Sequence, residues 1–136
     1  MEEIFRISRI LSDRFAKDLH RVQAETLAPY GLTARHAPYL LSLFEAEEGR
    51  TLSELSRAVL LDKANTTRVA RELGARDFVR RGGCARGCRV MLTEQGRKVA
   101  GELLARVTEI RRAGLAALTE EERGALLGIM KKLAQS

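Results

Sequence analysis

The feature that most constrains the fold is a pair of helix N-terminal signals lying close together near the middle of the chain. Thr51-Leu52-Ser53-Glu54 matches the S/T-x-x-E capping box, and Asp62 precedes a second run with helical character. The chain between these signals has room for one short helix, over about 53–59, before another begins at Lys63. Two short helices joined by a tight turn predict a helix-turn-helix with its second helix over about 63–76.

The period of the apolar residues changes directly after this unit. Residues 78–81 and 89–92 are β-prone, and they flank a glycine-rich centre over 82–88. Two short strands around such a centre predict a β-hairpin. A hairpin that follows a helix-turn-helix is the wing of a winged-helix fold.

Longer amphipathic helices are predicted on both sides of this lobe. Residues 2–28 repeat apolar side chains at three- and four-residue steps, and Pro29 and Gly31 end that run. Thr33 is a candidate N-cap for a helix reaching about Glu48. Pro38 lacks an amide donor, so that helix is expected to begin late or to bend.

Two further threonines open the helices of the C-terminal part. Thr93 is the expected cap of a helix over about 94–113, and Thr119-Glu120-Glu121-Glu122 forms a second capping box before the last helix. The terminal helices carry more apolar surface than a small lobe can cover, and a second copy of the chain is the economical partner. We therefore expect one mainly α domain over 1–136, with a winged helix-turn-helix over about 33–93. Dimerisation helices are expected over about 2–28 and 94–135.

The basic residues are concentrated in the predicted lobe. Between Arg57 and Arg89 the chain has nine basic and three acidic residues, so this stretch holds the whole net charge of +6. A local basic field on a neutral body favours binding to phosphate backbones, because each neutralised phosphate releases counterions. A solvated basic face without a partner is the alternative that charge alone leaves open.

The start of the second short helix carries the side chains that could read DNA bases. A helix in the major groove offers its first turns to the bases, and Asn65, Thr66 and Thr67 are short hydrogen-bonding residues there. Asn can pair with adenine, and Thr can contact a thymine methyl group. Lys63, Arg68 and Arg71 are better suited to phosphates. Helix capping and ordinary surface polarity are the alternative roles of the polar residues.

Two motifs carry a resemblance to a known family. Residues 61–68, Leu-Asp-Lys-Ala-Asn-Thr-Thr-Arg, and Leu92-Thr93-Glu94-Gln95-Gly96 are similar to the recognition-helix start and the L-T-x-x-G of the MarR (multiple-antibiotic-resistance regulator) family. The resemblance covers nearly the whole chain and is most specific over 51–81 and 92–96. It implies an obligate homodimer on a pseudo-palindromic operator, with a small-molecule pocket between the dimer helices and the DNA-binding lobe.

The residues expected to serve these roles fall into two sets. The predicted effector is a small aromatic or lipophilic molecule, and Tyr30, His36 and Tyr39 are the candidates for its pocket. For His36 we favour the alternative of a surface or dimer-interface histidine. The predicted DNA contacts are Ser53, Lys63, Ala64, Asn65, Thr66, Thr67, Arg68, Arg71, Arg80, Arg81, Arg86 and Arg89.

The chain departs from the family pattern at the wing and at the end of the recognition helix. The family wing usually carries Asp-x-Arg at its tip, whereas the shorter hairpin here reads Cys84-Ala85-Arg86, so Arg86 lacks an acidic brace. Asp77 stands where a glycine normally ends the recognition helix, and Asp tolerates the left-handed conformation less well than Gly. Gly74 inside that helix costs about 1 kcal/mol relative to Ala.

The two cysteines allow two interpretations. Cys84 and Cys88 flank the hairpin tip, where an oxidised pair could form a redox switch that moves Arg86. Two reduced surface thiols are the reading we favour, because disulfides are rare in the cytosol. One pair of thiols without further ligands gives no metal site.

The remaining observations exclude other classes of protein. No signal peptide or membrane-spanning stretch is visible, which predicts a soluble, cytoplasmic protein without a membrane partner. No catalytic constellation or cofactor motif stands out, so we expect neither an enzyme nor a cofactor. The sequence favours a homodimeric transcriptional regulator, a repressor, that binds double-stranded DNA and is relieved by a small-molecule ligand. The alternatives are a thiol-based redox regulator and a winged-helix protein-interaction module without specific DNA binding.

Overall fold

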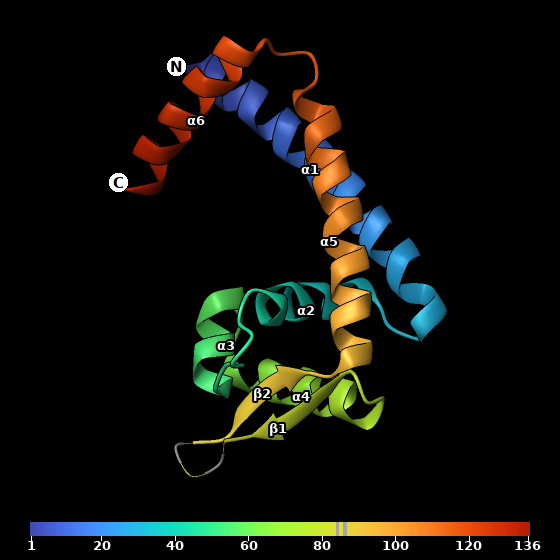
Figure 1. Cartoon of the computed structure of the whole chain (residues 1–136). Coiled ribbons are helices and arrows are strands. Elements are labelled where there is room, and N and C mark those ends of the chain that lie inside the picture. The colour runs from blue at the N-terminus through green and yellow to red at the C-terminus, as the bar shows by residue number, and fades with distance from the viewer. Residues whose placement is uncertain (84, 86) are drawn as a thin grey trace.

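The computed structural model describes residues 1–83, 85 and 87–136 and contains the predicted elements in the predicted order. A winged-helix lobe lies at one end of the molecule, and two long helices extend from it side by side (Figure 1). None of the helices over the described residues is both long and apolar enough to pass through a bilayer. The helices and strands are α1 (Glu2–Leu27), η1 (Ala28–Tyr30), η2 (Ala34–His36), α2 (Ala37–Phe44), α3 (Leu52–Val59), α4 (Lys63–Ala75), β1 (Val79–Gly82), β2 (Arg89–Leu92), α5 (Glu94–Leu115) and α6 (Glu120–Ala134).

The predicted N-caps form at both helices of the helix-turn-helix. The Thr51 side chain accepts a hydrogen bond from the backbone N–H of Glu54 (3.1 Å), and Asp62 accepts one from Asn65 (2.6 Å). These contacts satisfy amide groups that the first helical turn leaves without intrahelical partners. The two local signals therefore set where α3 and α4 begin.

The second predicted helix differs from the expectation at both ends. The chain first forms the 3₁₀ turn η2, and α2 then begins at Ala37 with Pro38 in its first turn, which confirms the late start. The expected end near Glu48 is wrong, because α2 ends at Phe44. The chain turns so that Arg50 can pair with Val90 of β2 through two backbone hydrogen bonds, of 3.0 and 2.7 Å.

The wing is an antiparallel hairpin of β1 and β2 in which Val79 pairs with Leu92 and Gly82 with Arg89. Val79, Val90 and Leu92 are buried against the lobe, whereas Arg80 and Arg81 of β1 are exposed. The buried core joins the lobe to the long helices. It comprises Leu27, Leu32, Ala37, Tyr39, Leu40, Leu43, Leu55, Val69, Ala70, Leu73, Phe78, Val79, Val90, Leu92, Val99, Ala100, Leu103 and Val107.

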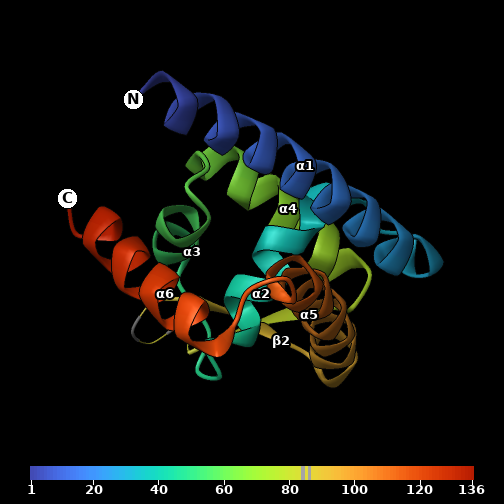
Figure 2. The same ribbon diagram turned by 90° about the horizontal axis from the view of Figure 1, so that it is seen from above.

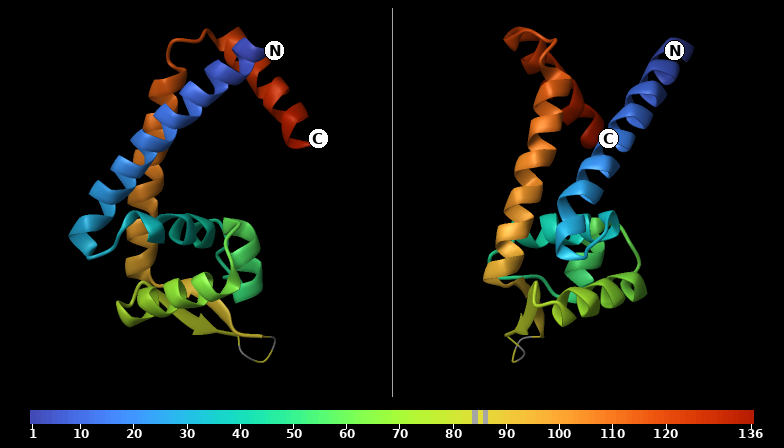
Figure 3. Two further views of the ribbon diagram at one scale, coloured as in Figure 1. Left: turned by 180° about the vertical axis from the view of Figure 1, so that it is seen from behind. Right: turned by 90° about the vertical axis from the view of Figure 1, so that its right-hand side faces the viewer.

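The outer parts of the terminal helices have little to pack against within one chain. Helix α1 packs along α5, but its N-terminal half is exposed, and α6 lies apart from α1 when seen from above (Figure 2). Side views show the outer parts of α1 and α5, together with α6, extending away from the lobe (Figure 3). A loop after α5 leads to α6, in which no side chain is buried.

Candidate nucleic-acid interface

Helix α4 has one face in the core and one in solvent. Thr66, Val69, Ala70 and Leu73 are buried against the lobe. Lys63, Ala64, Arg68 and Arg71 are exposed, while Asn65 and Thr67 are half-buried. An amphipathic helix with a cationic outer face is the arrangement that major-groove binding requires.

The predicted base contact by Thr66 is wrong for this conformation. Its side chain has no exposed surface, and its hydroxyl donates a hydrogen bond to the backbone carbonyl of Asp62 (2.9 Å). A β-branched hydroxyl residue at this position satisfies the helix locally and packs into the core. The hydroxyl of Thr67 likewise donates to the carbonyl of Lys63 (2.9 Å), although Thr67 itself reaches the surface.

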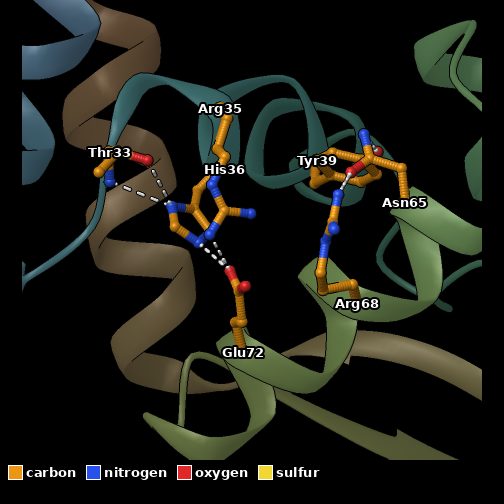
Figure 4. A network of polar contacts seen from close by, with 7 residues as sticks. All are labelled: Thr33, Arg35, His36, Tyr39, Asn65, Arg68 and Glu72. Carbon is orange, nitrogen blue, oxygen red and sulfur yellow. Dashed lines mark hydrogen bonds and ion pairs between the residues drawn. The ribbon is translucent and has the colours of Figure 1, made fainter.

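A chain of polar contacts joins α2 to the outer face of α4 (Figure 4). Arg68 donates from Nη2 to Oδ1 of Asn65 (2.5 Å), and Asn65 donates from Nδ2 to the hydroxyl of Tyr39 (3.4 Å). The Tyr39 hydroxyl also lies 3.4 Å from Oγ1 of Thr66. Asn65 is therefore already engaged on both sides of its amide group.

A second contact chain ties η2 to the C-terminal half of α4 (Figure 4). The backbone N–H of Thr33 donates to Nδ1 of His36 (3.0 Å), so the proton of the neutral imidazole is on Nε2. Nε2 lies 2.8 Å from Oε2 of Glu72, and Arg35 donates to the same oxygen (2.6 Å). The hydrogen bond from His36, supported by Arg35, holds the pKa of Glu72 below its ordinary value.

These contacts correct the expectation for His36. The side chain is buried within the lobe and bonded to α4, so it is neither a surface residue nor part of the exposed outer helices. The sequence did not predict Glu72 as the partner of His36, because the two residues lie far apart along the chain. No local spacing pattern connects an η2 residue to the third turn of α4.

The three residues predicted for an effector pocket do not all lie together, because His36 and Tyr39 contact α4 whereas Tyr30 contacts α5. Tyr39 has no exposed surface and faces α4, whereas the Tyr30 hydroxyl donates to Glu102 of α5 (2.7 Å). That hydrogen bond raises the pKa of Tyr30. The Tyr30 ring also meets Phe78 edge to face, with centroids 6.3 Å apart. In this conformation a molecule reaching His36 or Tyr39 would have to displace packed side chains.

A groove of about 550 Å³ runs between α4 and the hairpin. Thr67 and Arg71 line its α4 side, and Arg80 and Arg81 line its β1 side. Within the described chain, none of these three arginines forms an ion pair with a carboxylate. Guanidinium groups without internal partners can bind phosphate oxygens at little cost.

Ser53 and Arg89, two further predicted DNA contacts, differ in exposure and in bonding. Ser53 is exposed in the first turn of α3. Arg89 is turned toward the lobe, where it donates to the carbonyl of Gly49 (3.2 Å) and lies 3.5 Å from Glu54. Arg89 therefore anchors the hairpin to the helix-turn-helix in this structure.

The tip of the hairpin bears on the redox prediction. Arg86 and Cys84 lie outside the described residues, so the predictions for them stay untested. Cys88 is half-buried and disulfide-bonded. The favoured expectation of a reduced thiol is therefore wrong for Cys88 in this structure.

Comparison with known proteins identifies the fold. No protein-family profile matches the chain, and no curated protein sequence does. Among solved structures, the chain is similar to a MarR transcriptional regulator from Methanosarcina mazei. The two share 22% identity with a TM-score of 0.79, over 95% of this chain and 87% of the other. MarR from E. coli in its apo form shares 25% identity with a TM-score of 0.68, over 90% and 93%.

Two further neighbours were solved with bound partners. MepR from S. aureus in complex with DNA shares 17% identity, with a TM-score of 0.76 and coverage of 92% of each chain. CouR from Rhodococcus jostii bound to p-coumaroyl-CoA shares 23% identity, with a TM-score of 0.70 and coverage of 93% and 87%. The chain has the winged-helix fold of MarR-family transcriptional regulators, which confirms the predicted resemblance and fold class.

Proposed function

We propose that this chain is a sequence-specific DNA-binding transcriptional regulator of the MarR type that acts as a homodimer. The observation that carries the proposal is the cationic surface formed by the outer face of α4 and the adjoining strand β1. Arg71, Arg80 and Arg81 surround one groove and have no carboxylate partner among the described residues. The duplex backbone supplies phosphates to such a groove while α4 enters the major groove.

The experiment is selection of bound fragments from genomic DNA, followed by affinity measurements at several salt concentrations. A specific regulator enriches a pseudo-palindromic site and loses affinity steeply as salt rises. Replacing Arg80 with Ala should weaken binding to all sequences alike and reduce the salt slope by about 1. A parent chain that enriches no site would favour the protein-interaction module instead.

A homodimer would cover the apolar surface that one chain leaves exposed. The exposed fractions of Phe5, Ile129 and Leu133 are 66%, 56% and 71%. They belong to a set of exposed large apolar side chains on the helices at both ends of the chain, and exposed apolar surface that forms a patch marks an interaction site. Two copies joined at these helices would present two copies of α4 to successive half-sites of an operator.

We further propose that a small aromatic or lipophilic effector relieves repression. CouR, which shares the fold, was solved with p-coumaroyl-CoA. The effector would act by favouring a spacing of the two α4 helices that no longer matches one turn of DNA. Compounds that raise the melting temperature of the protein should be screened for release of the selected operator. An operator complex that resists every stabilising compound would contradict ligand relief.

Redox regulation is a second candidate that one observation favours, namely the disulfide-bonded state of Cys88. Under this hypothesis, oxidation and reduction of Cys84 and Cys88 would change the conformation of the wing and therefore the affinity of the protein for DNA. Operator affinity should then differ between peroxide-treated and dithiothreitol-treated protein. Equal affinity, with thiol titration showing that the two samples differ in oxidation state, would contradict the hypothesis.

A further inference from the structure

The amide group of Asn65 is held between two side chains that differ sharply in exposure. On one side it donates to the hydroxyl of Tyr39, which is buried, and on the other it accepts from Arg68, which is exposed. The three side chains form a row that runs from the lobe core to the outer face of α4 (Figure 4). Only the last of them reaches fully into solvent.

The hydrogen bonds of this row have a fixed direction. The single hydroxyl proton of Thr66 goes to the carbonyl of Asp62, so its oxygen is left to accept from Tyr39. With its own proton used in this way, the Tyr39 hydroxyl accepts from Nδ2 of Asn65. Oδ1 of Asn65 must then face Arg68, which can only donate. A flipped amide would turn its NH2 group toward Arg68, so that two donors would face each other, and the observed orientation of Asn65 keeps both contacts.

This order conflicts with the simplest role for Asn65. Pairing with adenine uses both the carboxamide oxygen and the carboxamide nitrogen of Asn, directed to the same base edge. Here those two atoms are directed to different protein groups, one of them buried. Over the described residues, by contrast, Arg68 has no other hydrogen-bond partner, so the rest of its guanidinium group is available to O6 and N7 of guanine, the commonest specific contact in the major groove.

We infer that Asn65 is a positioning residue that orients Arg68, and that Arg68 reads a base of the operator. Tyr39 anchors the arrangement from α2. This inference rests on the proposed DNA-binding function and assigns its specificity to one side chain. An arginine that is already oriented loses less conformational freedom when it binds a base edge.

The test is site selection from a randomised duplex library with the parent protein, five variants and one control variant. Arg68→Ala should abolish a preference at one position of each half-site, which in the parent is roughly tenfold or more. Asn65→Ala should weaken the preference at that same position, and Tyr39→Phe should weaken it partly. The double variant Asn65→Ala/Arg68→Ala should lose no more than Arg68→Ala alone, because the two residues act as a unit.

The fifth variant, Asn65→Asp, distinguishes positioning from direct reading. A carboxylate still accepts from Arg68, so the preference should survive even though the added negative charge lowers overall affinity. Lys63→Ala is the matched control and should weaken binding without changing any preference. Circular dichroism and melting temperatures verify that each variant folds.

Two results would overturn the inference. Asn65→Ala and Arg68→Ala could alter different positions with additive effects, or Asn65→Asp could lose the preference as fully as Asn65→Ala. Either result would indicate that Asn65 itself contacts a base. A parent chain that selects no sequence at all would overturn the proposed function, and this inference with it.

Discussion

Gly96 shows how a single residue of the L-T-x-x-G sequence constrains the fold. It lies in the first turn of α5, where the Thr93 side chain accepts its backbone N–H (3.0 Å). A Cβ added at this position would overlap the carbonyl oxygen of Phe78, at the junction of α4 and β1. The glycine therefore permits α5 to begin directly against the start of the wing.

Replacing Gly96 with Ala should lower the free energy of unfolding by about 1–3 kcal/mol, because the clash is with backbone that cannot rotate away. Gly74→Ala is the matched control. Its Cβ would lie 3.9 Å from Val79, an ordinary contact, so Ala should raise stability by about 0.5–1 kcal/mol. Urea denaturation measures both. Equal effects of the two substitutions would contradict the close approach at Gly96.

Glu72 makes stability depend on pH in a defined direction. Its pKa in the folded protein is lowered from the ordinary 4.5, chiefly by the hydrogen bond from His36. A carboxyl group with a lowered folded pKa stabilises the protein above its unfolded pKa and loses that contribution as the pH falls through the folded value. Glu72→Gln removes the contribution at every pH.

The parent should therefore be more stable than Glu72→Gln at neutral pH, and the difference should shrink as the pH falls below about 4.5. Denaturant titrations of both proteins over this range measure it. A difference that stays constant with pH would show that Glu72 acts through packing rather than through its charge.

At the scale of helices and strands, the sequence predicted the parts that depend on neighbours along the chain. The caps at Thr51, Asp62, Thr93 and Thr119 form because each serves the turn that follows it. The C-terminal end of α4 is likewise set by residues that are neighbours along the chain. Asp77 adopts a left-handed φ of 65°, and the N–H of Phe78 bonds to the carbonyl of Leu73 (2.9 Å).

The parts that could not be predicted depend on partners distant along the chain. Helix α2 ends early because Gly49 and Arg50 must approach β2, and Gly49 has a φ of 82° there. The burial of Thr66 and the bond from His36 to Glu72 arise in the same way, since only packing of α2 on α4 brings these groups together. Residue type and spacing carry no signal for such pairs.

The N-cap of α4 gives a prediction at this scale. Asp62→Ala removes the acceptor of the Asn65 amide and should lower the free energy of unfolding by about 1 kcal/mol. Asp62→Asn retains a side-chain oxygen and should stay close to the parent, which makes it the matched control. Urea denaturation measures both variants. If Asn were as destabilising as Ala, the charge of Asp62 rather than its hydrogen bond would be the stabilising factor.

At the scale of the whole molecule, the distribution of exposed apolar surface separates the two ends. In the lobe, Leu60 and Leu61 are the large apolar side chains that are exposed, whereas most of the others that are exposed lie on α1, α5 and α6. Between these three helices lies a cavity of about 950 Å³ that is open to solvent and lined in part by Phe15 and Met130. The homodimer proposed above would place a second copy of the chain against this exposed apolar surface.

Sedimentation equilibrium should accordingly find the parent as a dimer at micromolar concentration. Ile129→Asp should weaken dimerisation at least about tenfold, because an unpaired carboxylate in an apolar interface is costly. Its operator affinity should fall in parallel, since each monomer would bind one half-site alone. Lys132→Ala, on the same helix, is the control and should leave the dimer intact. A parent that stays monomeric at all concentrations, or an Ile129→Asp variant that dimerises normally, would show that the apolar ends of α1 and α6 do not join two copies of this chain.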